Sequence, residues 1–567
     1  MDIEKEIRKF ALQNAARFDG KANPGAVVGK VLNLDSKLRT KASEIGRKAA
    51  EVCAEVNKLT PEQQKEEIMQ LDPSLLEEKP KQEKKRELPE LKGAKKGKVV
   101  MRFAPSPSGP MHIGHAYAIS LTSEYCRRYD GKLILRIEDT NPENIYKKAY
   151  DLLPEDARWL TKDRIHEVWI QSGRLGVYYD YAQKLVEMEK AYVCECDTDR
   201  FRKLVFEKKA CPCRDIPKKE QVLRFEKMFS GYKAGEAVLR LKTDINHKNP
   251  AMRDFPLMRI NEHKHPRQGT KHRVWPLMNL AVFVDDVEGC MTHIIRAKDH
   301  MDNAKRQEYL YRYFQKPVPE SLFVGRLNFE GMPISCSKTR VLIEEGKYEG
   351  WDDIRLPFLL ALRRRGYQPE AFINWAVDIG LSQADKTVTK KDFFKSLDAF
   401  NRDIVDPVAN RYFFVWDPVK VRIKGAPSQK VELELHPDHP KRGKRKFKTG
   451  ELFYLCKEDV DSMKDGMLNR LMDCLNLVKD RDKFKFDPTG YENFKEQGGR
   501  IIHWLPAKDV VKVEVHMPDE DRRVVKGYGE KKLEKLKQGD VVQLERFGFC
   551  RLDEKKKDKL VFWFGHR

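Results

Sequence analysis

The sequence lacks the features that would place the protein in a membrane or outside the cell. None of its apolar runs reaches the roughly 18 residues that a membrane-spanning helix needs, and the opening residues Met1–Lys5 are too charged for a signal peptide. Its 11 cysteines are an odd number, and seven stand singly, which is typical of reduced thiols. These absences predict a cytoplasmic protein without a membrane partner.

Acidic residues are too few to balance the basic ones. The 567 residues include 110 Lys and Arg against 88 Asp and Glu, a formal net charge of +22, and no acidic tail offsets the excess. Such an excess favours a polyanionic partner, above all nucleic acid. The alternative is a charge-rich surface of the kind found in thermophilic proteins.

The length and the changing hydrophobic pattern predict several domains. We expect α/β and all-β parts: a Rossmann-like, parallel-sheet catalytic domain with an insertion, a helical connector, C-terminal β-barrels and an N-terminal helical appendage. The predicted segments are the appendage over 1–75, a Lys/Glu/Pro-rich linker over 76–97, catalytic halves over 98–174 and 275–345, the insertion over 175–274, the connector over 346–404 and the β-barrel region over 405–567.

A strand–helix–strand unit opens the catalytic region. The strand, the helix and the second strand are expected over 98–103, 113–128 and 133–137. This order predicts a parallel sheet with a right-handed crossover, and ligands of such sheets bind beyond the carboxyl ends of the strands. The expected crevice therefore lies beside Arg102, His112-Ile113-Gly114-His115 and Glu138.

Two short motifs suit a nucleotide. His112 and His115 stand at the start of the helix, where unsatisfied backbone N–H groups and the helix dipole favour phosphate. Further along, Ser335-Cys336-Ser337-Lys338-Thr339 is expected in a loop, where the Lys338 ammonium would neutralise charge as an α-phosphate is attacked. Taken alone, this second segment can equally be an ordinary polar loop.

Four cysteines form two close pairs in the insertion. Cys194 and Cys196 are separated by 14 residues from the pair Cys211 and Cys213. Four thiolates at this spacing can close a tetrahedral zinc site, whose role would be structural because the protein fills every position. Reduced thiols in a basic insertion, or labile disulfides, are the alternatives.

Short basic stretches recur along the chain. They are Lys208-Lys209, Lys218-Lys219, Arg363-Arg364-Arg365 and His439–Lys446. Because lysine and arginine contacts to phosphates position RNA, we interpret these stretches as candidate RNA contacts.

Together the motifs resemble class I aminoacyl-tRNA synthetases of the glutamyl/glutaminyl branch, and closely the archaeal glutamyl-tRNA synthetases. The resemblance runs from about residue 98 to the C-terminus and is carried by Arg102–His115, Leu135–Glu143, Trp351–Pro357 and Leu362–Tyr367. The family has Lys-Met-Ser-Lys-Ser where this chain has Ser335–Thr339, so only Ser337 and Lys338 match.

The resemblance implies a ligase that activates glutamate with ATP and Mg²⁺ and transfers it to the 3′ end of tRNA(Glu), with tRNA(Gln) as an open second acceptor. The implied catalytic residues are His112, His115, Ser337 and Lys338. The implied ATP-binding residues are Pro105, Gly109, His112, Gly114, His115 and Lys338. The insertion would bind the acceptor stem, the β-barrels would bind the anticodon, and structural Zn²⁺ would occupy Cys194, Cys196, Cys211 and Cys213.

The resemblance also implies how the amino acid is held. Arg102 would bind its side-chain carboxylate, with Ser106 nearby, while Glu138 would bind the α-amino group and Arg296 the α-carboxylate. A doubly negative, singly positive amino acid needs two guanidinium groups and one carboxylate. Relatives carry a tyrosine where this chain has Met278, so another contact, for which Asn279 is a candidate, must replace it.

Two alternatives remain open. The first is a glutaminyl-tRNA synthetase, but Pro105–Gly109 and Ile137–Pro142 resemble the glutamate enzymes. The second is a non-catalytic tRNA-binding protein with a synthetase-like core, against which the intact His112, His115 and Lys338 argue. The appendage over 1–75 could grip RNA or dock a partner protein.

Overall fold

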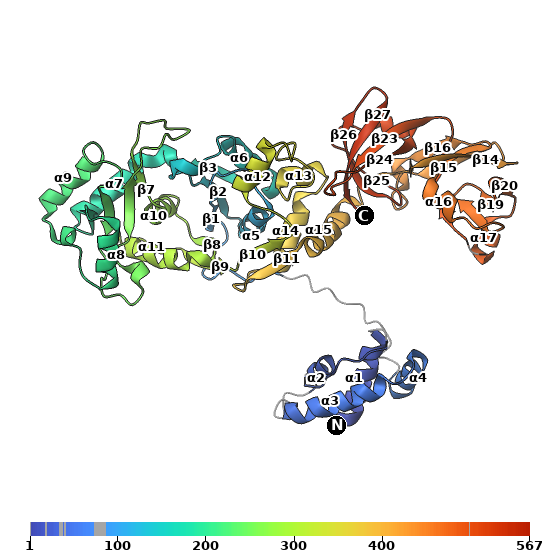
Figure 1. Cartoon of the computed structure of the whole chain (residues 1–567), viewed down its shortest axis with the longest axis horizontal. Helices are drawn as coiled ribbons and strands as arrows, with labels where there is room; N and C mark the ends of the chain where they lie inside the picture. Colours follow the sequence, from blue (N-terminus) through green and yellow to red (C-terminus); the bar gives the residue numbers. More distant parts are fainter. Residues whose placement is uncertain are drawn as a thin grey trace. The chain divides into compact units, whose positions relative to one another are not determined.

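The computed structural model describes residues 2–17, 20–32, 34, 38, 41–72, 87–497 and 499–567. The chain divides into two compact units, Met1–Lys85 and Arg86–Arg567, which are labelled and coloured along the sequence in Figure 1. Within the described ranges, no helix is long and apolar enough to cross a membrane.

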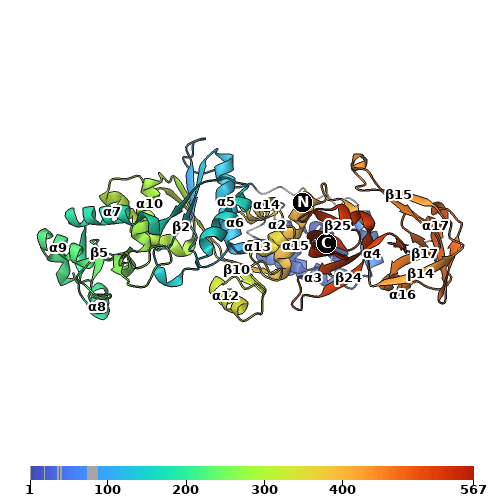
Figure 2. The ribbon, with the colours of Figure 1, turned by 90° about the horizontal axis from the view of Figure 1, so that it is seen from above.

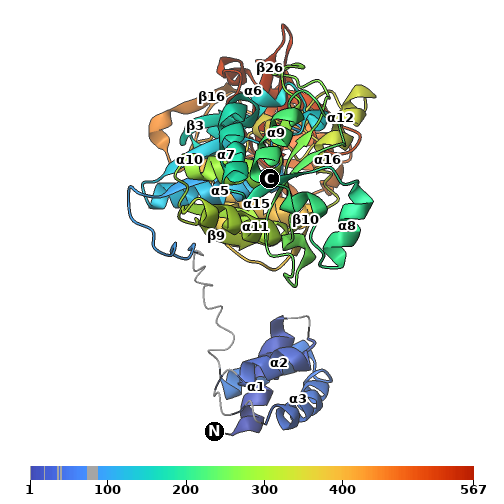
Figure 3. The same ribbon diagram turned by 90° about the vertical axis from the view of Figure 1, so that its left-hand side faces the viewer.

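The N-terminal unit is helical, as predicted. Its described helices are α1 (Ile3–Arg17), α2 (Pro24–Leu32), α3 (Ala42–Val56) and α4 (Pro61–Leu71). Figure 3 shows these helices gathered in one unit. Their buried apolar side chains include Ile7, Val31 and Ile68. Asn23 caps the start of α2, since its side chain accepts a hydrogen bond from the Gly25 amide at 2.9 Å.

Part of the predicted linker belongs to the larger unit. Residues 73–86 lie outside the described ones, but Leu88 and Leu91 are buried in the catalytic core. The Tyr125 hydroxyl also donates to the carbonyl of Pro89 at 2.9 Å. These contacts anchor residues 87–97 to the larger unit. We had expected these residues to belong to the linker.

The catalytic sheet is parallel, as predicted. Strands β1 (Val100–Phe103), β2 (Lys132–Ile137) and β3 (Ile165–Ile170) pair in the order β1-β2-β3. The parallel pair β8 (His293–Ala297) and β9 (Glu320–Val324) lies on the other side of β1, where the amide of Thr292 donates to the carbonyl of Val100 at 2.9 Å. The strand order therefore reverses between β1 and β8, which is where ligands of such sheets bind.

Helices cover this sheet and connect it to its neighbours. They are α5 (Ile113–Arg128), α6 (Ala149–Thr161), α10 (Met278–Glu288), α11 (Met301–Tyr313), α12 (Cys336–Glu344), α13 (Leu359–Arg364), α14 (Pro369–Ile379) and α15 (Lys390–Val405). Strand β10 (Leu327–Glu330) of the second catalytic half pairs in parallel with β11 (Lys386–Thr389) of the connector.

The insertion has its own antiparallel sheet and core. Its elements are α7 (Leu175–Glu187), β4 (Ala191–Cys194), α8 (Thr198–Phe206), α9 (Lys218–Met228), β5 (Val238–Leu241), β6 (Pro256–Ile260) and β7 (Val274–Pro276). Within the larger unit, the insertion and the C-terminal strands lie on opposite sides of the catalytic sheet (Figure 1; Figure 2).

The C-terminal region over 405–567, where we expected β-barrels, is largely β-structure. In the part of the chain that is described, it forms two seven-stranded sheets and a separate hairpin. Its strands are β12 (Arg411–Tyr412), β13 (Phe414–Trp416), β14 (Pro418–Lys424), β15 (Lys430–Glu434), β16 (Lys444–Lys448), β17 (Leu452–Cys456), β18 (Leu468–Leu471), β19 (Asn476–Asp480), β20 (Lys483–Asp487), β21 (Ile501–Ile502), β22 (Leu505–Pro506), β23 (Val510–His516), β24 (Val524–Glu530), β25 (Val541–Leu544), β26 (Gly548–Lys555) and β27 (Lys559–His566). Two short helices, α16 (Lys457–Ser462) and α17 (Tyr491–Gln497), interrupt them.

One basic stretch has a different use from the predicted one. Arg364 makes ion pairs with Asp352 at 2.9 Å and with Asp553 of β26 at 3.0 Å. Arg365 is buried and donates to the carbonyl of Gly565 at 2.7 Å. These two arginines tie the connector to the C-terminal strands, and the interpretation as an RNA contact was wrong for the buried Arg365.

Candidate active site

The paired histidines form the N-terminal cap of α5. The Nδ1 atom of His112 accepts from the amides of Gly114 at 3.1 Å and His115 at 3.3 Å. The Nδ1 atom of His115 accepts from the amide of His112 at 3.4 Å. The two rings stack with their centroids 3.8 Å apart. This reciprocal arrangement is a capping box built from imidazoles instead of the usual hydroxyl and carboxylate.

These capping hydrogen bonds determine which ring nitrogen of each histidine carries the proton. Since Nδ1 accepts a backbone N–H in both rings, the neutral tautomer carries its proton on Nε2 and can donate it outward. Burial lowers the pKa of His115 to about 4, and burial together with His115 lowers the pKa of His112 well below its ordinary value. The pair is therefore neutral at physiological pH and suited to hydrogen-bonding a phosphate.

We expect NMR of ¹⁵N-histidine-labelled protein to show His112 and His115 neutral, with the proton on Nε2, down to pH 6. Only the unfolded chain gains these protons between pH 6.5 and 4, so the pair's contribution to stability is complete above pH 6.5 and is lost as the pH falls through that window. Signals can be assigned with His112→Gln and His115→Gln. A titration midpoint between pH 6 and 7 for either residue would contradict this prediction.

The predicted Ser-Lys segment lies against the histidine motif. The Cys336 Sγ donates to the carbonyl of Pro110 at 3.8 Å, and a Cβ on Gly109 would lie 2.9 Å from both Cβ and Sγ of Cys336. Because any side chain at position 109 would clash with Cys336, only glycine lets the two segments come this close. The two segments that we expect to bind phosphate thus meet on one side of the sheet.

The local structure of this segment differs from the predicted loop. Ser335 caps α12, accepting from the amide of Lys338 at 3.5 Å, and Cys336–Thr339 form the first turn of that helix. Ser337 and Lys338 are exposed. Lys338 therefore stands at a second helix N-terminus, another position that favours an anion.

A small pocket lies at the reversal of strand order. It is lined by Arg102, Ala104, Glu138, Met278, Val282, Arg296, His300, Asn303 and Gln307. Three of the four residues expected to bind the amino acid, Arg102, Glu138 and Arg296, line this pocket. Ser106, the fourth, is exposed and is not among the described residues that line this pocket.

Ion pairs behind the pocket connect its arginines. Arg136, fully buried, donates to Asp286 at 2.6 Å and to Glu138 at 3.0 Å. Asp286 lies 3.6 Å from Arg102 and 3.9 Å from Arg296. Burial opposes the charge on Arg136, but Asp286 and Glu138 raise its pKa. Arg136 therefore holds Glu138 in place. The Asp286 carboxylate is shared by the guanidinium groups of Arg136, Arg102 and Arg296.

The whole arginine–carboxylate network carries one excess positive charge. Its described members are Arg102, Arg136, Arg174, Arg296, Glu138, Asp285 and Asp286. Burial and then Arg136 lower the pKa of Arg102 to about 10, and burial lowers the pKa of Arg296. The buried Nε atoms of both have no hydrogen-bond acceptor among the described residues. An anionic ligand in the pocket would balance this charge.

Sequence reasoning missed Arg136, Asp285, Asp286 and Gln307 as parts of this site. A signal was available for the first three, because they interrupt the apolar runs Leu133–Ile137 and Leu280–Val287. Charged residues are almost never fully buried unless they are paired. Gln307 lies on a polar helix, and nothing in its sequence context marks it.

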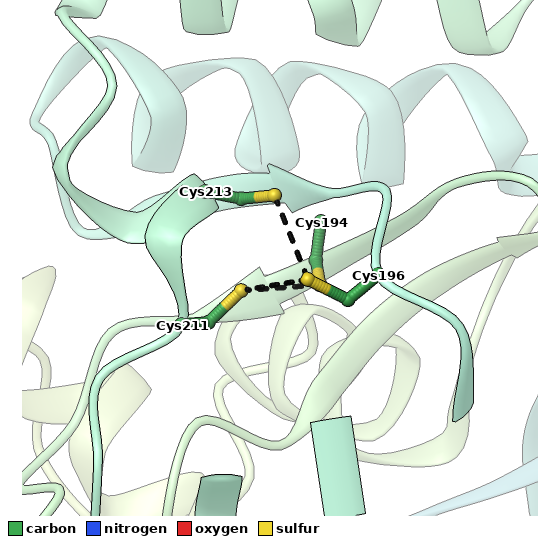
Figure 4. A group of neighbouring side chains, drawn as sticks. All are labelled: Cys194, Cys196, Cys211 and Cys213. Atoms are coloured by element: carbon green, nitrogen blue, oxygen red, sulfur yellow. Dashed lines mark hydrogen bonds between the residues drawn. The ribbon is translucent and has the colours of Figure 1, made fainter. Parts of the chain in front are cut away.

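The four paired cysteines come together in the insertion (Figure 4). Their sulfur atoms lie within 4.8 Å of one another, with separations of 3.6 Å for Cys194–Cys211, 3.4 Å for Cys196–Cys211 and 4.0 Å for Cys196–Cys213. Zinc–sulfur bonds of about 2.3 Å in a tetrahedron place sulfurs about 3.8 Å apart. All the cysteines, each within a described range, are free. The donor set therefore fits zinc, and the disulfide alternative is not observed.

We expect purified protein to contain about one zinc per chain. Cys211→Ser should lower the zinc content and the melting temperature of the insertion, because three ligands hold the metal less tightly. Cys290→Ser, at a single exposed thiol, is the matched control. Atomic emission and thermal unfolding measure the two effects. A zinc-free preparation with undiminished thermal stability would contradict the prediction.

The fold and the site define a parallel-sheet α/β domain in which a histidine-capped helix and an arginine-lined pocket lie where ligands of such sheets bind. Residues 98–407 match the family model described as tRNA synthetases class I (E and Q), catalytic domain. Residues 409–491 and 501–553 match the two anti-codon binding domains of the same group. The chain therefore belongs to the class I tRNA synthetases of the E and Q family.

Curated relatives match the chain along its whole length. Glutamate–tRNA ligase of Methanobrevibacter smithii is 45% identical over 568 residues, and that of Pyrococcus furiosus is 45% identical over 580 residues. Each match covers 100% of both chains. Among solved structures, a glutamate tRNA ligase from Elizabethkingia meningosepticum is similar with a TM-score of 0.38 and 17% identity, over 55% of this chain and 70% of that chain.

Proposed function

We propose that this protein is a glutamate–tRNA ligase that uses ATP to form glutamyl-adenylate and then aminoacylates tRNA(Glu). The single excess positive charge of the arginine–carboxylate network carries the assignment. Glutamate has a net charge of −1 at neutral pH and would balance it. Glutamine has no net charge and would leave a buried positive charge uncompensated, which is costly.

The pocket residues account for each polar group of glutamate. In this proposal Arg102 binds the side-chain carboxylate, Glu138 binds the α-ammonium group and Arg296 binds the α-carboxylate. Arg102 lies on β1, Arg296 lies on β8 and Glu138 directly follows β2, so the rigid sheet fixes their separation. Ser106 would contribute only if its loop closes toward the pocket.

The nucleotide would lie between the two helix N-termini. The α-carboxylate oxygen attacks the α-phosphorus of ATP, a P–O bond forms, and the bond to the leaving pyrophosphate breaks. His112 and His115 donate hydrogen bonds from Nε2–H to phosphate oxygens, and Lys338 and Ser337 stabilise the charge that develops. Pro105, Gly109 and Gly114 would complete the binding site for ATP.

ATP would bind together with Mg²⁺, which neutralises part of the triphosphate charge. Positioning and charge neutralisation suffice, so no covalent protein intermediate is needed.

The remaining modules would bind tRNA in the cytoplasm. The insertion over 175–274 would hold the acceptor stem, with zinc bound to the four cysteines stabilising its fold, and the C-terminal sheets over 405–567 would bind the anticodon. The unit over 1–75 would serve as an RNA-gripping or partner-docking appendage. tRNA(Gln) stays the second candidate acceptor.

Separate charging of purified tRNA(Glu) and tRNA(Gln) with labelled glutamate or glutamine tests the proposal. We expect glutamate to be preferred over glutamine by at least about 1,000-fold, as is typical of sites built around paired polar groups. A preference for glutamine would overturn the assignment. Charging of tRNA(Gln) with glutamate would establish the second acceptor.

A further inference from the structure

We propose that Gln307 is a specificity-determining residue, which binds Arg296 through a neutral amide and so leaves the positive charge of Arg296 available to the amino acid. The inference rests on the proposed function and concerns the same pocket. Gln307 lies on α11, is 2% exposed and lines the pocket.

The contacts of Gln307 orient its amide. Its Oε1 accepts from Nη1 of Arg296 at 2.9 Å, and its Nε2 donates to Oδ1 of Asn279 at 3.5 Å. Asn279, on α10, is itself buried. Because Arg296 can only donate, this chain of contacts directs the Gln307 carbonyl toward Arg296. Asn279 thus supports Gln307 from the side facing away from the arginine.

Two other cations of the network, Arg136 and Arg174, make hydrogen bonds to carboxylates, whereas Arg102, like Arg296, only approaches Asp286. Arg136 hydrogen-bonds to Asp286 and Glu138, and Arg174 donates to Asp285 at 2.8 Å. Arg296 lies 3.9 Å from Asp286. Among the described residues, its one hydrogen-bond acceptor is the uncharged amide of Gln307.

A carboxylate at position 307 would change this balance. It would accept the same hydrogen bond at the same place, pair with Arg296 and remove the excess positive charge of the network. Two unit charges about 4 Å apart interact strongly even at the effective dielectric of a protein site. The pocket would then match the neutral glutamine better than glutamate. The neutrality of residue 307 therefore helps to determine which amino acid is selected.

Gln307→Glu tests this inference, with Gln307→Met as the matched control that removes the hydrogen bond but adds no charge. We expect Gln307→Glu to lower the ratio of kcat/KM for glutamate to that for glutamine by about 100-fold. Gln307→Met should lower both values together and leave the ratio within about threefold. Lys305→Gln changes the net charge equally at an exposed position of α11 and should have no effect. ATP–pyrophosphate exchange with tRNA present measures all three.

If Gln307→Glu does not fold, a second variant, Asn279→Asp, tests the same inference. Asn279→Asp keeps an acceptor for Nε2 of Gln307 and places the added charge one residue farther from Arg296. It should lower the same ratio by about 10-fold. An unchanged ratio in the folded charge variant, or an equal change in Gln307→Met, would overturn the inference. A wild-type enzyme that prefers glutamine would instead overturn the proposed function, so the two failures can be told apart.

Discussion

Replacing Lys338 with alanine is expected to slow adenylate formation by about 1,000-fold, since removing one charged group that stabilises a transition state costs 10²–10³ or more. Lys338 is exposed at the first turn of α12, beside the motif capped by His112. Its ammonium group is not buried, so its removal should cost the fold little. ATP–pyrophosphate exchange measures the rate, and filter binding measures tRNA affinity, which should stay within about threefold.

Lys347→Ala provides the matched control for this change. Lys347 is also exposed and follows the end of α12, so the same substitution there removes an equal charge away from the predicted phosphates. Its exchange rate should equal that of the wild type. Unchanged exchange in Lys338→Ala would refute the phosphate role. A parallel loss of tRNA binding or of thermal stability would show that Lys338 acts through the fold instead.

Asp286→Asn is expected to destabilise the catalytic domain by about 3–5 kcal/mol, the usual cost of removing one partner from a buried ion pair. Asp286 is 2% exposed, accepts a hydrogen bond from Arg136 at 2.6 Å and approaches Arg102 and Arg296. Without its charge, three guanidinium groups would repel one another across the pocket. Denaturant unfolding measures the stability loss.

Glu288→Gln is the control for the aspartate variant. Glu288 ends the same helix but is exposed, and its carboxylate accepts only a surface hydrogen bond from Tyr181 at 2.7 Å. Its substitution should cost less than about 0.5 kcal/mol. Equal stability of Asp286→Asn and Glu288→Gln would contradict our description of a shared buried counter-ion. Saturating glutamate should partly restore the melting temperature of Asp286→Asn, because a ligand that binds only the folded state stabilises it.

Local sequence signals predicted the phosphate-binding part of the site better than the amino-acid pocket. The histidine motif follows a buried strand and begins a helix, and α5 spans the predicted residues 113–128. The cysteine spacing likewise predicted the grouping of the four thiols. The Ser-Lys segment was placed in a loop because short polar stretches resemble turns, whereas Ser335 in fact caps a helix.

The sequence by itself determined the order of the modules, the parallel sheet and the helix that begins at the histidine motif, whereas Arg102 and Arg296 were assigned to the pocket only through the family resemblance. These features depend on neighbouring residues, whose periodicity and turn chemistry act over a few positions. Only the tertiary structure decided that Asp286 balances arginines from β1, β2 and β8, that Gln307 binds Arg296, and that Arg364 joins Asp553. Such pairings join residues far apart along the chain, and the free energy of burying each charge depends on a partner that only folding brings near.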